Sequence, residues 1–355
     1  MKSSILLIYT GGTIGMQEDP ETKALRPYDF SHLMAEVPEL SKFALRIDSY
    51  TFSPLIDSSD VEPAFWQSIA EIVRSRYDDY DGFVVLHGTD TMAYSASALS
   101  FMLEGLSKPV VFTGSQLPVG MPRTDGKENL ISAVEIASAR DASGRAMVPE
   151  VCIFFNSRLL RGNRSTKVNA EDFDAFRSPC FPALATAGIN IRYDESVIHH
   201  TSRPALTVNT ALDTRVSILK VHPGITEHVA RHLLCDPQIR AVIIETYGSG
   251  NCISKPWFVD IVREACASGK IVLNVTQCLS GCVDMDRYAT GLVLKEAGVI
   301  SGGDMTTEAA LAKLFVLMGR CSDTPEGNAS VKALLPANLR GEITGPSGLI
   351  FGNNL

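Results

Sequence analysis

Four short segments of the 355-residue chain combine glycine with hydroxyl-bearing, carboxylate or amine side chains. They are residues 10–15 (TGGTIG), 87–91 (HGTDT), 113–116 (TGSQ) and 161–167 (RGNRSTK). A threonine hydroxyl becomes a nucleophile when a neighbouring group accepts its proton. A partly desolvated lysine can lose its proton and serve as that base. These residue types predict nucleophilic and acid–base chemistry on a small polar molecule.

Thr13 is the first candidate nucleophile, because the glycine-rich turn around it allows its side chain to point into a crevice. Thr89, Asp90 and Lys167 can form a relay of hydroxyl, carboxylate and amine, in which Asp90 orients the lysine and balances its charge. The alternative is that both threonines only cap turns or helices. Lys167 would then be a solvated surface lysine. The residues alone leave both interpretations open.

A further polar segment, residues 53–60 (SPLIDSSD), contains the candidate ligand-holding residues Asp57 and Ser58. They could bind the ammonium and carboxylate groups of an amino acid. The structural alternative is a helix N-cap, with Ser59 or Asp60 preceding a helix that begins at Pro63.

The elements that must position these residues alternate between buried strands and helices. Strands are expected at 5–9, 82–86, 109–112 and 151–155, and helices at 63–77, 91–106 and 129–140. This alternation is typical of an open parallel α/β sheet. Ligands bind outside the carboxyl ends of such strands, where the four segments lie. Residues 16–27 look like a polar loop.

A second alternation follows an irregular, proline-containing stretch. Its expected strands are 216–221, 241–245 and 271–275, and its expected helices are 226–234, 256–268 and a terminal helix at 306–318. We therefore predict a two-domain α/β protein. Residues 1–204 form a larger N-terminal domain with an open, mostly parallel sheet and helices on both faces. Residues 205–212 form a linker, and residues 213–355 form a smaller C-terminal α/β domain.

Composition excludes several classes of function. The chain has 32 Lys and Arg against 40 Asp and Glu, a net charge of −8, so no nucleic-acid partner is expected. The first apolar run, residues 5–9, is too short for a secretory signal or a membrane span, and we expect a cytoplasmic protein without membrane contact. Eight cysteines are scattered without the pattern of a zinc site.

The glycine spacing disfavours a nicotinamide oxidoreductase. Residues 11–15 read G-G-x-x-G, whereas the dinucleotide-binding fingerprint is G-x-G-x-x-G at the start of a helix. We therefore expect no dinucleotide cofactor, and the strand ends show little sign of a metal cage.

Residues 10–15 and 87–91 resemble the two signature motifs of the L-asparaginase/glutaminase family of bacterial type. Further segments resemble its cytoplasmic, type I branch: 55–60 (LIDSSD), 161–167, 247–251 (YGSGN), 274–278 (NVTQC), 289–291 (ATG) and 338–342 (NLRGE). The resemblance covers nearly the whole chain. It implies hydrolysis of L-asparagine to L-aspartate and ammonia through a threonine nucleophile and an acyl-enzyme, and it allows a weak activity on glutamine. It also implies that no metal and no organic cofactor takes part.

The resemblance also implies a role for each candidate. Thr13 is similar to the family's primary nucleophile, and Thr89, Asp90 and Lys167 match its second catalytic group. The family carries a tyrosine on a flexible lid after the first motif, and Tyr28 is the nearest candidate here.

For substrate binding, Asp57 and Ser58 match the family's ligand-holding pair. Asp90 is placed to bind the substrate ammonium, and backbone N–H groups near Gly88 and Thr89 are expected to stabilise the oxyanion. The family's assembly, a tetramer built from dimers, implies self-association.

Two other functions remain as alternatives. An ammonia-supplying subunit of a tRNA-dependent amidotransferase would need a further N-terminal domain and a nucleic-acid-associated partner. A non-catalytic amino-acid sensor would be expected to lack one of Thr13, Thr89, Asp90 or Lys167, and all four are present.

Overall fold

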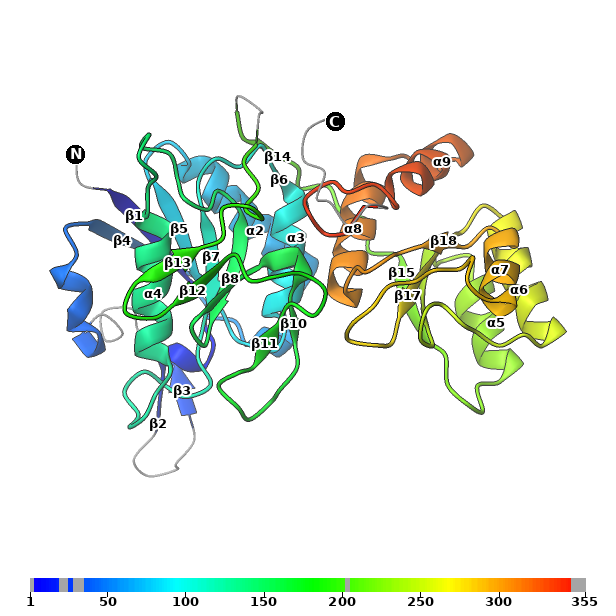
Figure 1. Ribbon diagram of the computed structural model, residues 1–355, viewed down its shortest axis with the longest axis horizontal. Coiled ribbons are helices and arrows are strands. Elements are labelled where there is room, and N and C mark those ends of the chain that lie inside the picture. The colour runs from blue at the N-terminus through cyan, green and yellow to red at the C-terminus, as the bar shows by residue number, and fades with distance from the viewer. Residues whose placement is uncertain (1–2, 19–24, 28–34, 202–204, 346–355) are drawn as a thin grey trace. The chain divides into compact units, whose positions relative to one another are not determined.

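The computed structural model describes residues 3–18, 25–27, 35–201 and 205–345. It divides into two units, Met1–Asn209 and Thr210–Leu355. The predicted two-domain α/β architecture is confirmed (Figure 1).

The first unit is organised around an eight-stranded sheet in the order β13-β12-β9-β8-β7-β5-β1-β4. Five neighbouring strands run parallel: β4 (Arg46–Thr51), β1 (Ser4–Tyr9), β5 (Gly82–Leu86), β7 (Val110–Thr113) and β8 (Val151–Phe155). Most of the central residues are apolar and buried, as expected of a parallel sheet covered on both faces.

The far edge of this sheet is antiparallel, which the strand–helix alternation did not predict. It consists of β9 (Arg158–Arg161), β12 (Ala185–Ala187) and β13 (Ile191–Tyr193). A tight turn at Asn156 and Ser157, both with positive φ, reverses the chain between β8 and β9. That reversal directs the chain toward residues 161–167.

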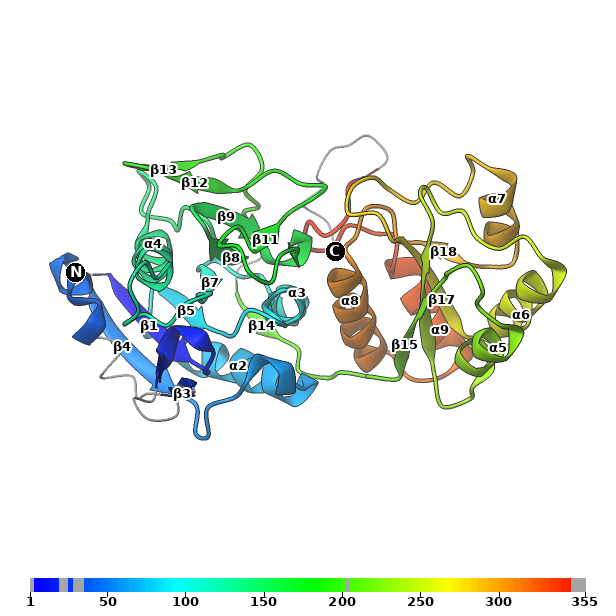
Figure 2. The ribbon, with the colours of Figure 1, turned by 90° about the horizontal axis from the view of Figure 1, so that it is seen from below.

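Helices cover both faces of the sheet, as predicted. Figure 2 shows α4 (Gly126–Ser138) on one face and α2 (Pro63–Arg76) and α3 (Met92–Met102) on the other. Successive residues of β5 point to opposite faces of the sheet, so this strand packs against helices on both faces. A Cβ on Gly82 would lie 2.4 Å from the carbonyl oxygen of Ala137 in α4. The next residue, Phe83, stacks on Tyr77 at the end of α2.

One local expectation was wrong. Residues 16–27 were expected to form a polar loop, but β2 (Met16–Glu18) and β3 (Leu25–Pro27) pair as an antiparallel hairpin. The short strands carry no apolar alternation that would have revealed them.

The second unit contains a four-stranded parallel sheet. Its strands, in order, are β15 (Val216–Lys220), β16 (Ala241–Thr246), β17 (Ile271–Thr276) and β18 (Ile300–Ser301). The described residues of this unit also form five helices: α5 (Glu227–Cys235), α6 (Pro256–Ala267), α7 (Ala289–Glu296), α8 (Thr307–Arg320) and α9 (Pro325–Leu334).

Alternate residues of β16 pack into two separate hydrophobic cores. Val242 and Ile244 pack with residues of α5, α6 and α7, whereas Ala241 and Ile243 pack with α8 and α9. Helix 306–318 was expected to be terminal, but α9 follows it and completes the second core. Among the described residues, no helix has both the length and the apolar character needed to cross a membrane.

Candidate active site

Three loops meet at the carboxyl ends of β1 and β5 because glycines permit backbone contact. A Cβ on Gly12 would lie 2.6 Å from the Cα of Gly88. A Cβ on Gly88 would in turn lie 2.5 Å from Ser58 Oγ, and one on Gly11 would lie 2.4 Å from the carbonyl oxygen of Ile56. Any larger residue would push these loops apart. The glycines of both signature segments therefore hold the site together.

Thr13 and Thr89 lie directly beside this contact. Thr13 begins the 3-10 helix η1 (Thr13–Gly15) and is half-buried. Within the described residues its hydroxyl makes no hydrogen bond, which leaves it available to a ligand. Thr89 is buried and follows β5, whose residue Leu86 lies opposite Tyr9 of β1. The two threonines thus follow neighbouring strand ends.

Lys167 contacts Thr89 and Asp90, which lie 78 and 77 residues away in the sequence, respectively. Its Nζ lies 2.8 Å from Thr89 Oγ1 and 2.7 Å from Asp90 Oδ1. The Lys167 side chain is only 19% exposed, against 63% for Asp90. Lys167 is therefore not the solvated surface lysine of the alternative interpretation. The hydroxyl, amine and carboxylate form one connected group.

A buried ion pair anchors the segment that carries Lys167. Arg161, at the end of β9, donates from Nε and Nη2 to the carboxylate of Glu150 at 2.6 and 3.0 Å. Nη2 also donates to the carbonyl of Val197 at 2.7 Å. Ser165 Oγ donates to the Arg161 carbonyl just before β10 (Thr166–Lys167). Glu150 had no assigned role in the sequence, because only the fold pairs it with Arg161.

The Asp57–Ser58 segment forms its own short turn. Asp57 caps the 3-10 helix η3 (Ser58–Asp60), accepting from the backbone N–H and hydroxyl of Ser59 at 2.9 and 2.8 Å. These two donors lower the pKa of Asp57. Ser58 is buried, and its carbonyl accepts from Thr91 Oγ1 at 2.6 Å. The proposed cap of α2 by Ser59 or Asp60 does not form, since Glu62 occupies that position.

A buried chain of hydrogen bonds supports the Gly88 backbone. It was not predicted from the sequence. Trp66 Nε1 donates to Ser95 Oγ at 2.9 Å, and Ser95 Oγ lies 2.9 Å from His87 Nε2. His87 Nδ1 lies 2.6 Å from the Gly88 carbonyl. A carbonyl can only accept, so Nδ1 carries the hydrogen and Nε2 accepts from Ser95. Burial lowers the pKa of His87 to about 4, which keeps the imidazole neutral.

This shift predicts a pH-dependent loss of stability. As pH falls below 6.5, the unfolded chain protonates His87 before the folded chain does, so stability is complete above that pH and declines toward pH 4. Between pH 7 and pH 5 the loss from His87 is about 2 kcal/mol. Urea unfolding at both pH values measures it.

The variant His87→Gln should lose this part of the pH dependence, because an amide does not titrate. The matched control His200→Gln, at an exposed histidine, should keep the wild-type dependence. Equal pH dependence in His87→Gln and the wild type would contradict the assignment.

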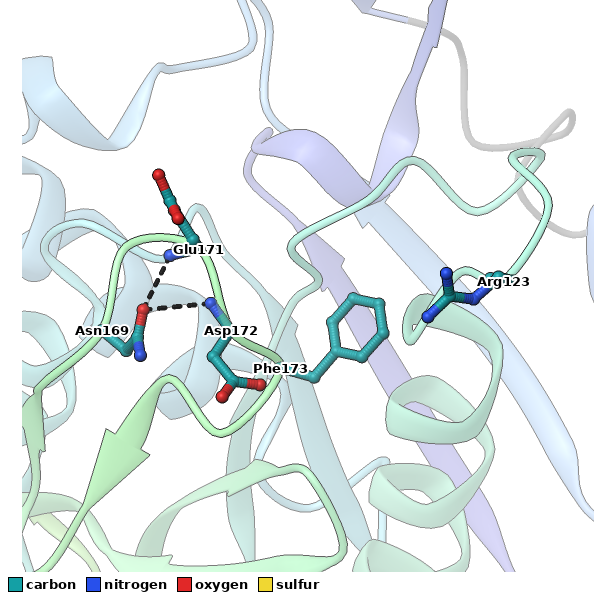
Figure 3. A pocket seen from close by; sticks show the side chains of 5 residues that line it. All are labelled: Arg123, Asn169, Glu171, Asp172 and Phe173. Carbon is teal, nitrogen blue, oxygen red and sulfur yellow. Dashed lines mark hydrogen bonds between the residues drawn. The ribbon is translucent and has the colours of Figure 1, made fainter.

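A cavity of about 460 Å³ opens beside the candidate site (Figure 3). It is lined by Arg123, Asn169, Glu171, Asp172 and Phe173. The carbonyl of Asp172 accepts from Gln116 Nε2 at 3.1 Å, and Thr89 Oγ1 lies 3.4 Å from Gln116 Oε1. Gln116 therefore connects the cavity wall to the relay. Its segment was noted in the sequence, but Gln116 itself was assigned no role.

Tyr28, the candidate lid tyrosine, lies outside the described residues. Among the residues that the structure covers, no three His, Cys, Asp or Glu side chains cluster in a way that could hold a metal ion.

Comparison with known proteins covers both units. Residues 4–199 match the family described as Asparaginase, N-terminal, and residues 215–329 match the Glutaminase/Asparaginase C-terminal domain. L-asparaginase 1 of Escherichia coli K12 is 44% identical over 344 residues, which cover 97% of this chain and 98% of that protein. The crystal structure of L-asparaginase I from Vibrio cholerae is 41% identical, with a TM-score of 0.85, and the match covers 97% of this chain and 100% of that one.

A longer relative is also similar. The human 60 kDa lysophospholipase is 42% identical over 366 residues, covering 97% of this chain but 62% of the human protein.

Proposed function

Because this chain belongs to the asparaginase family and is similar to its type I members, we propose that it is an L-asparaginase, which hydrolyses L-asparagine to L-aspartate and ammonia. The observation that carries the proposal is the contact of Lys167 Nζ with both Thr89 Oγ1 and Asp90 Oδ1. A hydrolase of an unreactive amide needs a proton relay of this kind.

In the proposed mechanism Thr13 attacks the side-chain carbonyl of asparagine. Its proton passes to the Thr89–Lys167 relay, and the carbonyl oxygen becomes an oxyanion. Backbone N–H groups near Gly88 and Thr89 stabilise that charge, and one such donor contributes about 3 kcal/mol. The relay then protonates the departing nitrogen, ammonia leaves, and water hydrolyses the ester on Thr13. If Thr89 attacked first, the same relay would serve it directly.

We propose that the charged groups of the substrate bind to Asp57, Asp90 and Ser58. Asp57 is held ionised by Ser59, and its Oδ2 has no protein donor among the described residues, so it can accept from the α-ammonium. Asp90 supplies a second carboxylate near Lys167. Ser58, buried against Gly88, is positioned to donate its hydroxyl to the α-carboxylate.

The same proposal covers the substrate selectivity of the protein, its self-association and its cellular location. L-Glutamine is one methylene longer than L-asparagine, and a binding site discriminates against one methylene by only about 1–3 kcal/mol. Weak turnover of L-glutamine is therefore expected. Similarity to type I asparaginases supports self-association as a dimer or tetramer and a cytoplasmic location. The hairpin of β2 and β3 follows Thr13 immediately and is the proposed base of a lid over the site.

The test is ammonia release from L-asparagine and L-glutamine over a wide concentration range. Fast release from asparagine and slow release from glutamine are expected, and a sigmoidal curve would indicate allostery. Lysophosphatidylcholine is assayed alongside because of the lysophospholipase relative. Absence of ammonia from both amino acids, in a folded protein, would contradict the hydrolase and favour the sensor or amidotransferase-subunit alternatives.

A further inference from the structure

We propose that Gln116 is a positioning residue that orients the Thr89 hydroxyl and so controls the direction of proton flow between Thr89 and Lys167. The proposal rests on the function proposed above. Neither the signature motifs nor the proposed hydrolysis gives Gln116 this role. Gln116 is half-buried and follows β7, the strand next to β5.

The hydroxyl hydrogen of Thr89 points away from Lys167. A hydroxyl has one hydrogen to donate and two lone pairs that accept. Lys167 as an ammonium can only donate, so its bond of 2.8 Å uses a lone pair of Thr89 Oγ1. The Thr89 hydrogen must therefore point elsewhere, and Gln116 Oε1, 3.4 Å away, accepts it.

The Gln116 amide has a defined orientation. Its two ends differ, and the end that faces Thr89 is fixed by what the other end touches. The partner there is the backbone carbonyl of Asp172 at 3.1 Å, which can only accept, so that end is the Nε2 amine. The carbonyl end, Oε1, consequently faces Thr89.

Hydrogen bonds hold both the backbone and the side chain of Gln116. The Gln116 backbone N–H is bound by both carboxylate oxygens of Asp125 at 3.1 and 3.0 Å. The same carboxylate accepts from the Leu117 N–H at 3.2 Å and from Asn129 Nδ2 at 3.2 Å. Asp125 thus fixes the backbone of Gln116, and Asp172 fixes its side chain.

The consequence is a competition for one proton. While Lys167 is an ammonium, the Thr89 O–H points to Gln116 and the relay is idle. After Lys167 has lost one proton to solvent, its lone pair can accept, and the Thr89 O–H turns from Gln116 Oε1 to Lys167 Nζ. Thr89 Oγ1 can then receive the proton of the nucleophile. Gln116 therefore links the readiness of the relay to the charge of Lys167.

The Lys167 side chain is 19% exposed, so its proton can pass to solvent. Asp172 lines the open cavity shown in Figure 3, and its carbonyl is the one that Gln116 binds. The charged groups near this pair of residues are Asp90, which contacts Lys167, and Asp125, which binds the Gln116 backbone. The neighbouring cavity is lined by three more: Asp172, Glu171 and Arg123.

Three variants test the proposal through the pH dependence of kcat for L-asparagine. Gln116→Glu keeps an oxygen acceptor but adds a negative charge beside Thr89 Oγ1, the atom that Lys167 contacts. Gln116→Met keeps the chain length and removes the acceptor. Both lose the Nε2 donor to Asp172, so any effect of loosening that loop is common to the two. Gln238→Glu, the same change at an exposed position of the second unit, is the control.

In Gln116→Glu the acid limb of the profile should move up by about 1 pH unit or more, because the carboxylate stabilises the ammonium form of Lys167. At high pH its kcat should approach the wild-type value. Gln116→Met should show no upward shift, and Gln238→Glu should superimpose on the wild type.

A uniform loss of kcat at every pH, equal in Gln116→Glu and Gln116→Met, would overturn the proposal and leave Gln116 as an anchor of the 169–173 loop only. An unshifted Gln116→Glu profile would overturn it as well, while the proposed hydrolysis would stand. Ammonia release absent from the wild type would remove the hydrolase and this role together.

Discussion

Thr13→Ala is expected to lower kcat for L-asparagine hydrolysis by at least about 1000-fold while the protein stays folded. The hydroxyl makes no hydrogen bond within the described residues, so its removal costs the fold little. Steady-state ammonia release measures the loss, and circular dichroism with urea unfolding checks the fold. Thr51→Ala, which removes an exposed hydroxyl at the end of β4, is the matched control and should keep full activity.

A second variant distinguishes the two threonines. Thr89→Val breaks the contact with Lys167 and should cause a loss similar to that of Thr13→Ala. Residues that act as a unit are strongly non-additive, so the double variant should be little worse than either single one. If Thr13→Ala retained activity and Thr89→Val did not, Thr89 would be the nucleophile.

The elements of the first unit were predictable because each has a local signal. The apolar run of β5 (Gly82–Leu86) and the helical spacing of α2 (Pro63–Arg76) appear in the sequence within a residue of where the structure has them. The antiparallel edge from β9 to β13 was not predictable in this way. Its strands are short and alternate only weakly, and pairing decides their conformation.

The candidate site likewise contains residues that the sequence predicts and residues that it does not. Glycine and threonine at strand ends are visible in the sequence, and with the parallel-sheet rule they predict one common edge. The partners of these residues are not visible. Gln116 lies 27 residues from Thr89, and Ser95 lies 29 residues from Trp66. Such pairs arise from how helices and strands pack, which no local pattern encodes.

The second unit offers the largest expected effect on stability, at the ion pair of Lys313 and Glu342. Both side chains are fully buried, with Nζ 2.6 Å from Oε1. Lys313 also donates to the carbonyls of Leu335 and Ala337 at 2.7 and 2.6 Å, so all three of its hydrogens are used. The carboxylate accepts further bonds from backbone N–H groups just before it. The pair ties the segment after α9 to α8.

Lys313→Met should lower the free energy of unfolding by about 3–5 kcal/mol, because it leaves a buried carboxylate without its counter-charge. Urea unfolding measures the change. The matched control is Lys295→Met, which breaks a pair with Asp286 of the same length, 2.6 Å, between side chains that are 50% and 64% exposed. Water solvates both partners there, so the loss should be at most about 1 kcal/mol.

The double variant Lys313→Met/Glu342→Leu separates the value of the pair from the cost of an unpaired charge. Removing both charges eliminates the buried carboxylate, so stability should recover well above that of Lys313→Met. Recovery would be incomplete, since the carbonyls of Leu335 and Ala337 still lose their donor. A double variant no more stable than Lys313→Met would mean that the lost hydrogen bonds, and not the stranded charge, dominate. Equal losses in Lys313→Met and Lys295→Met would contradict the role of burial altogether.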